Sequence, residues 1–172
     1  MTSAATDKDG QSPFAILTDY ASRAVARDRG TRAAAAGGDA WDGMLCRLGA
    51  ERVVVPLADV TEVIDIPRLT EVPGTASWFL GLGSLRGRAI PFNDLGGYLH
   101  GRGASRSSIR RALVIELDTD AVAFVVDDLL GMHTLNGARR AYVSYQGDNL
   151  PVMNLAELAK QARFQRVDLE SV

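Results

Sequence analysis

Few side chains in this sequence have the type and spacing that chemistry requires. The two histidines, His100 and His133, and the single cysteine, Cys46, have no Cys or His partner at the spacing of a metal site. Asp127 and Asp128 are adjacent at an expected strand end, so their carboxylates point to opposite faces and we expect them to cap the following turn. No nucleophile stands in a context such as G-x-S-x-G. The sequence therefore predicts no catalytic residue, no metal site and no cofactor.

A glycine-rich segment, Gly81–Gly87, is the one candidate for a nucleotide cradle. Its glycines stand at the wrong spacing for G-x-G-x-x-G, and a strand rather than a helix is expected after it. We interpret these glycines as turn residues between two strands. Arg86 lies in this turn beside Gly87, where its planar guanidinium could bind a partner carboxylate. A merely solvated surface arginine is the alternative.

A basic segment further along the chain contains four arginines and three serines. They are Arg102, Arg106, Arg110 and Arg111 with Ser105, Ser107 and Ser108. No aromatic residue is interleaved that could stack on bases. We therefore expect a solvated loop between two structural units, with an electrostatic contact to an acidic protein or ligand as the alternative.

Composition and charge exclude several classes of protein. The 172 residues carry 19 Lys and Arg against 21 Asp and Glu, which does not make the basic surface that nucleic-acid binding requires. A single cysteine cannot form an internal disulfide, which favours a reducing compartment. Residues 1–11 lack the apolar run of a signal peptide, and the apolar run Ala121–Val126 is far shorter than the roughly 20 residues that cross a bilayer. We expect a cytoplasmic protein with no direct membrane insertion.

The chain divides into a leader, a β-rich domain and a tail. Residues 1–12 are polar and expected to be disordered, and residues 13–43 are expected to hold an N-terminal helix and a linker. Within Pro13–Arg29, apolar residues recur at helical steps, and Gly30 ends the pattern. Those apolar residues are Phe14, Leu17, Ala21, Ala24 and Val25. Residues 44–163 form the domain, and residues 164–172 the C-terminal tail.

Short apolar runs between turn residues predict many strands and few helices in that domain. Val63 and Ile64 are expected to be buried. The expected strands are Met44–Leu48, Arg52–Val55, Glu62–Ile66, Phe79–Leu85, Arg88–Phe92, Ala112–Leu117, Ala121–Val126, one strand preceded by a short helical turn after residue 128, Ala141–Gln146 and Leu150–Val152. The expected helical segments are Leu57–Val60, Asn93–Leu99 and a closing helix from Asn154 that carries Leu155, Leu158 and Ala162 on one face.

A weak internal duplication organises these strands. Residues 53–64 can be aligned with residues 122–133, and residues 89–95 with residues 149–155. Such self-similarity implies two copies of one supersecondary unit. Because closing short strands into a barrel removes exposed edges, we expect two small five-stranded β-barrels side by side with a groove between them. The barrel units would cover about 44–100 and 109–163, with strand exchange between them left open.

An ordered set of motifs in this domain resembles the CheW family of chemotaxis coupling proteins. The motifs are Leu45-x-x-Leu48-Gly49-x-Glu51, Val60-x-Glu62-Val63-Ile64, Val72-Pro73-Gly74, Gly81-x-x-x-Leu85-Arg86-Gly87-x-x-Ile90-Pro91-x-x-Asp94-Leu95 and Val125-Val126-Asp127. The N-terminal extension, with Ser12-Pro13-Phe14 and Trp41, looks like the PilI branch of this family, which serves type IV pilus twitching motility.

The resemblance implies a CheW-like fold of two five-stranded barrels and a non-enzymatic adaptor associated with membrane receptor arrays. Such an adaptor links the cytoplasmic tip of a methyl-accepting chemoreceptor to a CheA-type histidine kinase. By position, Val60 and Arg86 match residues implicated in receptor binding in the groove, and Gly81 and Gly87 shape the adjoining strand. The first barrel is expected to hold the regulatory domain of the kinase.

Two departures from the family pattern and one alternative function stay open at this point. Ser84 replaces the usual asparagine before Leu-Arg-Gly, and the stretch Leu135–Ala141 is shorter than is usual, which puts a loop or strand of the second barrel in doubt. The alternative is a regulatory domain that binds a small molecule in the inter-barrel groove. A closed polar pocket would favour that alternative, whereas an open apolar groove favours a partner helix.

Overall fold

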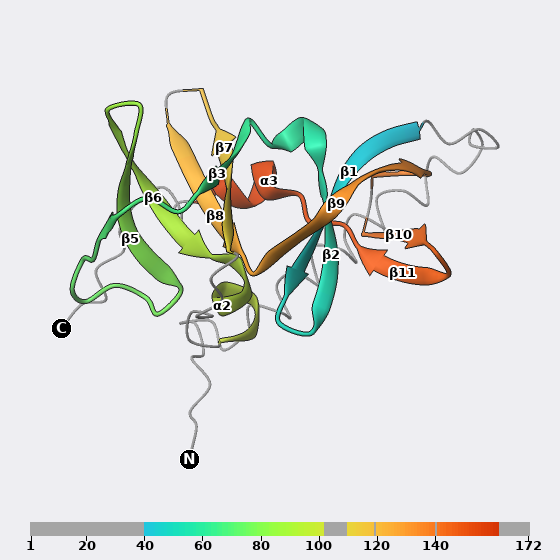
Figure 1. Ribbon diagram of the computed structural model, residues 1–172, viewed down its shortest axis with the longest axis horizontal. Helices are drawn as coiled ribbons and strands as arrows, with labels where there is room; N and C mark the ends of the chain where they lie inside the picture. The colour runs from blue at the N-terminus through green and yellow to red at the C-terminus, as the bar shows by residue number, and fades with distance from the viewer. Residues whose placement is uncertain (1–39, 102–109, 119, 140, 162–172) are drawn as a thin grey trace, which may run out of the picture.

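The computed structural model describes residues 40–101, 110–118, 120–139 and 141–161 (Figure 1). The strands are β1 Ala40–Leu48, β2 Glu51–Pro56, β3 Glu62–Asp65, β4 Leu69–Thr70, β5 Phe79–Leu85, β6 Arg88–Asp94, β7 Arg111–Glu116, β8 Ala121–Val126, β9 Asp128–Asn136, β10 Tyr142–Tyr145 and β11 Asp148–Pro151. The helices are the 3-10 turn η1 Leu57–Asp59, α2 Leu95–His100 and α3 Leu155–Ala159. The predicted leader helix, most of the serine–arginine segment, Ala162 and the tail lie outside the described residues.

One group of five strands forms the first structural unit. The sheet β2-β1-β9 is joined to the hairpin β10-β11 by a bridge between Val54 and Val152, and the Met153 amide donates to the Val54 carbonyl oxygen at 2.7 Å. All five strands contribute to one interior cluster, which contains Trp41, Leu45, Val54, Leu135, Val143 and Leu150. We call this unit the five-stranded barrel.

The remaining strands form a second unit with six strands in the order β3-β7-β8-β6-β5-β4. Its two edge strands, β3 and β4, are separated by only residues 66–68, so the sheet must curve until its edges approach each other. The interior contains Ile90, Phe92, Ala112, Val114, Ala121, Ala123 and Val125. We call this unit the six-stranded barrel, and its two-residue strand β4 makes it one strand larger than predicted.

Neither barrel is made from one continuous part of the sequence. The first two strands pair with the last three in the five-stranded barrel, while β3 to β8 form the six-stranded barrel. The sequence units at about 44–100 and 109–163 therefore do not correspond to the sheets, because strands are exchanged between them. The five-stranded barrel keeps β10 and β11 after the short stretch Leu135–Ala141, so this stretch removes no strand from it.

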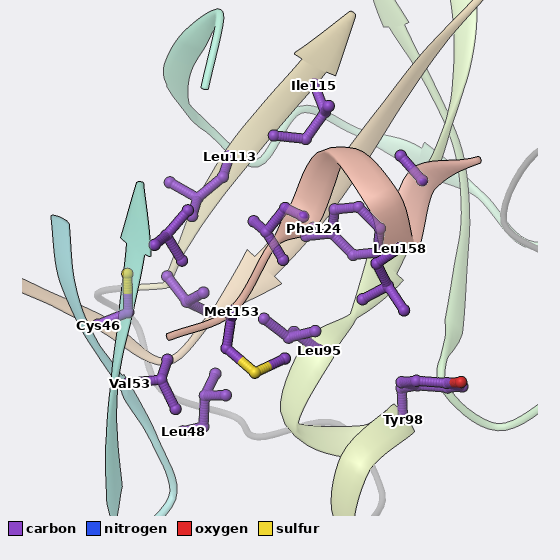
Figure 2. Packing of buried hydrophobic residues seen from close by; sticks show 14 of the residues in the cluster. Cys46, Leu48, Val53, Leu95, Tyr98, Leu113, Ile115, Phe124, Met153 and Leu158 are labelled. Carbon is purple, nitrogen blue, oxygen red and sulfur yellow. The ribbon is translucent and has the colours of Figure 1, made fainter. Parts of the chain in front are cut away.

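A shared apolar cluster, the central core, lies between the two barrels (Figures 1 and 2). Strand β8 is apolar on both faces because each face meets a different cluster. Ala123 and Val125 point into the six-stranded barrel, and Phe124 and Val126 point into the central core. The buried members of the central core are Met44, Cys46, Leu48, Val53, Val55, Leu95, Tyr98, Leu99, Leu113, Ile115, Val122, Phe124, Val126, Met153, Leu155, Leu158 and Ala159. The helix α3 lies between the two groups of strands and completes this core.

The structure confirms most of the predicted strands and corrects several details. The strand β1 begins at Ala40 rather than Met44, and the indole nitrogen of Trp41 donates to the Gly137 carbonyl oxygen at 2.9 Å, which anchors this early start. β6 continues to Asp94, so α2 begins two residues later than expected.

The predicted helical turn after residue 128 is wrong. The chain passes from β8 into the long strand β9, which pairs with β1 from Asp128 to Asn136. The two aspartates do not cap a following turn either. Instead, the Asp127 carboxylate accepts the Gly49 amide at 2.6 Å, and Asp128 pairs with Arg47 at 3.4 Å. Both contacts join distant parts of the chain, which sequence spacing does not show.

Candidate functional site: an apolar and charged surface beside the inter-barrel core

Arg86 lies at the tip of the β5–β6 hairpin, as the sequence predicts. Its φ of 51° is in the left-handed region, and Gly87 follows with a φ of 79°, so the two residues form the turn. Its Nη2 donates to Glu62 Oε2 on β3 at 2.9 Å, and the side chain is 71% exposed. An exposed ion pair of this kind contributes little stability. The guanidinium is therefore free to exchange this carboxylate for one on a partner.

Gly81 plays a different part from Gly87. It has a φ of 133° and lies at a register shift in the pairing of β5 with β6. A Cβ atom at Gly81 would lie 2.5 Å from the Thr70 carbonyl oxygen, whereas a Cβ atom at Gly87 would meet nothing within 4 Å. Gly81 thus permits the close approach of β4, and it is a buried structural residue rather than a contact surface.

Two valines, Val60 and Val63, lie near the start of β3. Val60 follows η1, donates its amide to the Leu57 carbonyl oxygen at 3.1 Å and packs, partly buried, against the central core. Val63 pairs with Leu113 of β7, which is a central-core residue, so its side chain lies on the face directed towards the five-stranded barrel. The prediction that Val63 is buried is wrong, because it lies on an edge strand and is 39% exposed.

The matching edge of the five-stranded barrel is apolar as well. Met132 on β9 pairs with Met44, a central-core residue, yet Met132 is 66% exposed. Val63 and Met132 are thus exposed apolar residues on the faces that the two barrels direct towards each other. Leu130, 40% exposed, lies at the bulge of the same strand. Sequence reasoning missed both β9 residues, although the two-residue spacing of Leu130 and Met132 was a usable strand signal.

Arg110 belongs to a buried charged cluster and not to a solvated loop. Its Nη2 donates to Asp94 Oδ2 at 2.5 Å, and its Nε lies 3.9 Å from Asp127 Oδ1. The other Asp94 oxygen accepts the Gly97 amide at 2.7 Å and caps α2. Burial raises the pKa of Asp94, and the Gly97 amide and Arg110 oppose that rise only in part. The cluster holds β6, β7 and β8 together.

The remaining chemistry-bearing residues make separate contacts. Arg111 pairs with Asp65 at 3.2 Å, His100 Nε2 lies 3.4 Å from Glu51 Oε2, and His133 lies 3.1 Å from the Tyr145 hydroxyl. Among the described residues, no group of three His, Cys, Asp or Glu side chains could hold a metal ion. No helix in the described ranges is long and apolar enough to span a bilayer.

The described residues between the two barrels pack together as the apolar central core. A small apolar crevice lies inside the five-stranded barrel instead, lined in part by Leu45, His133 and Tyr145, and it is too tight for a water molecule. These features favour a partner helix at an apolar surface over a small molecule in the groove.

A two-barrel fold with exposed apolar residues and an exposed arginine at a hairpin tip has the features expected of a protein-binding module. The chain belongs to the CheW-like domain family, whose model matches residues 42–140. This confirms the family resemblance that the motifs indicated.

Two curated proteins and one crystal structure are similar to this chain. The chain is 36% identical over 125 residues to protein PilI of Pseudomonas aeruginosa, covering 72% of this chain and 70% of that one. It is 34% identical over 90 residues to protein FrzA of Myxococcus xanthus, covering 52% of this chain and 56% of that one. The scaffolding protein TtCheW of Thermoanaerobacter tengcongensis matches in structure with a TM-score of 0.63 at 18% identity, covering 75% of this chain and 99% of that one, and shares the fold.

Proposed function

We propose that this protein is a non-enzymatic adaptor that couples the cytoplasmic tip of a methyl-accepting chemoreceptor to the regulatory domain of a CheA-type histidine kinase. The output is chemotaxis or type IV pilus twitching motility, and the site of action is the cytoplasmic side of membrane receptor arrays. The 36% identity to PilI over 72% of this chain supports the twitching output.

Receptor binding is supported by one observation: exposed apolar residues lie near an exposed arginine. Val60 packs against the central core, Val63 is exposed on β3 opposite the central-core residue Leu113, and Arg86 reaches Glu62 on β3. A receptor helix could bury its apolar stripe along the valines while a carboxylate on it replaces Glu62 as the partner of Arg86. Gly81 and Gly87 support this surface by shaping β5 and the hairpin turn.

For the kinase, we propose that its regulatory domain binds the barrel that contains the first strands of the chain. Because β1 and β2 belong to the five-stranded barrel, this barrel rather than a block of residues 44–100 is the candidate surface. Exposed Tyr142 on β10 is an aromatic residue of the kind that is enriched at such interfaces.

Calorimetry with a receptor-tip peptide and a purified kinase regulatory domain tests both halves. We expect Arg86→Ala to weaken receptor binding roughly tenfold and to leave kinase binding and the thermal midpoint unchanged, since a charged hydrogen bond is lost at an exposed site. Arg88→Ala is the matched control, because Arg88 lies on the same hairpin and pairs with Glu116 at 3.7 Å.

Two results would contradict the proposal. Binding of neither partner by the native chain would remove the adaptor function altogether. Equal loss of receptor binding in the Arg86 and Arg88 variants would show a diffuse effect of positive charge rather than a placed contact.

A further inference from the structure

The strand β9 exposes two apolar side chains, Leu130 and Met132, which we call the β9 patch. Together they are the most exposed large aliphatic residues of the described barrels, at 40% and 66%. The strand pairs with β1 along one edge only among the described strands. An unpaired strand edge that carries apolar side chains is a surface for another segment of chain.

The start of β1, to which the N-terminal leader is attached, lies on the same strand pair as this patch. Ala40 pairs with Asn136, which is four residues along β9 from Met132, about 13 Å at the usual rise of a strand. Residues 30–39, rich in alanine and glycine, connect this point to the leader and can span up to about 35 Å. The leader can therefore reach the patch from its own attachment point.

The sequence of the leader has the complementary chemistry. The residues Pro13–Arg29 predict an amphipathic helix whose apolar stripe includes Phe14, Leu17 and Val25. Such a stripe needs an apolar surface to cover it. Because the leader is tethered a short distance from the β9 patch, its effective concentration there is in the millimolar range, which favours this contact over one with a separate molecule.

We propose that the segment Pro13–Arg29 of this chain binds the β9 patch and covers Leu130 and Met132. This docking does not depend on the proposed function. One consequence does rest on it: because Met132 faces the six-stranded barrel, the docked leader would compete with a receptor helix, and releasing it would tighten receptor-tip binding.

Methyl NMR of the full chain tests the docking without any partner. A nitroxide is attached at Ser22→Cys, on the polar side of the leader. The native Cys46 does not compete for the label, because burial raises the pKa of its thiol to about 12. The four methionines then give four methyl signals, and we expect that of Met132 to lose more than half of its intensity.

Matched variants and a mixing experiment decide the outcome. Leu17→Glu, which breaks the stripe, should restore the Met132 signal, and Ala15→Glu, which adds the same charge off the stripe, should not. Absence of broadening, or broadening that survives Leu17→Glu, would overturn the proposal. So would broadening in a mixture of nitroxide-labelled and isotope-labelled chains, because it would make a second copy the occupant.

Receptor-tip calorimetry on Leu17→Glu tests the consequence separately. Severalfold tighter binding than in Ala15→Glu supports competition. Equal affinity in the two variants, with docking established by NMR, would overturn the competition while leaving both the docking and the adaptor function standing.

Discussion

At the scale of single residues, the structure separates contact residues from shaping residues within one short motif. Arg86 is exposed and holds only a surface ion pair, so it can serve recognition with little cost to stability. Gly81 is buried, and the carbonyl oxygen of Thr70 occupies the place where its Cβ would be. Two residues five positions apart in one motif are therefore under different physical constraints.

Substitution of the two glycines should reveal this difference. Both have positive φ, so alanine at either position is strained by about 1 kcal/mol. Only Gly81→Ala also collides with backbone, which adds about 2 kcal/mol. We expect urea denaturation to show a loss of about 3 kcal/mol in the free energy of unfolding for Gly81→Ala and about 1 kcal/mol for Gly87→Ala. Equal losses would mean that β4 shifts to make room.

At the scale of elements, the short helix α2 depends on a buried carboxylate at its start. A helix of six residues has too few internal hydrogen bonds to be stable alone, so Asp94 must hold it in place. This residue caps Gly97 and binds Arg110, and Arg110 follows the segment 102–109 that connects α2 to β7. The Asp94 side chain thus links the end of β6 to the start of α2 and, through Arg110, to the start of β7.

The titration of Asp94 should make the free energy of unfolding depend on pH. Burial raises its pKa in the folded protein, so the folded state holds the proton more tightly than the unfolded chain does. Its contribution is therefore fully present below the unfolded pKa and is lost as the pH rises through the folded pKa. Asp94→Asn keeps a capping side chain but does not titrate.

The measurement is the free energy of unfolding of both proteins from pH 3.5 to pH 7. We expect the native protein to lose stability relative to Asp94→Asn as the pH rises across this window. If the native protein instead gained relative stability, the ion pair with Arg110 would dominate over burial. Asn154, an exposed cap on α3, serves as a control position, because Asn154→Ser should leave the pH profile unchanged.

At the scale of the whole molecule, the central core makes the two barrels interdependent. Residues from β1, β2, β7, β8 and both α-helices meet there, and strand exchange joins the ends of the chain in one barrel. Unfolding one barrel would expose the apolar outer face of the other, which costs about 25 cal/mol per Å². We therefore expect the two barrels to unfold together.

The two tryptophans report on two parts of the molecule, the interior of the five-stranded barrel and the central core. Trp41 is buried in the five-stranded barrel, whereas the indole of Trp78 packs against the central core with its ring centroid 5.4 Å from that of Tyr98. In each single-tryptophan variant, Trp41→Phe and Trp78→Phe, we expect fluorescence and circular dichroism to give the same urea midpoint. Leu113→Ala in the central core should lower the stability seen by both reporters by about 3 kcal/mol. Separate midpoints would show that the barrels unfold independently.

Local sequence pattern by itself determined many of the strands and turns of this fold. The apolar run Ala121–Val126 predicted β8 with its observed bounds, and Leu-Arg-Gly placed Arg86 at a hairpin turn. These predictions succeeded because strand alternation and turn chemistry depend on residues that are near in sequence. The family motifs then identified the class of protein, since their order along the chain is more specific than any single one.

Only the tertiary structure decided which strands share a barrel and which side chains stay exposed. Val63 reads as a core residue, yet β3 is an edge strand, so one side of it meets solvent. The sequence places Arg110 in a solvated loop, yet Asp94 at the end of β6 and Asp127 between β8 and β9 lie on either side of it. Burial and charge pairing depend on residues far apart in sequence, and neither spacing nor composition contains that information.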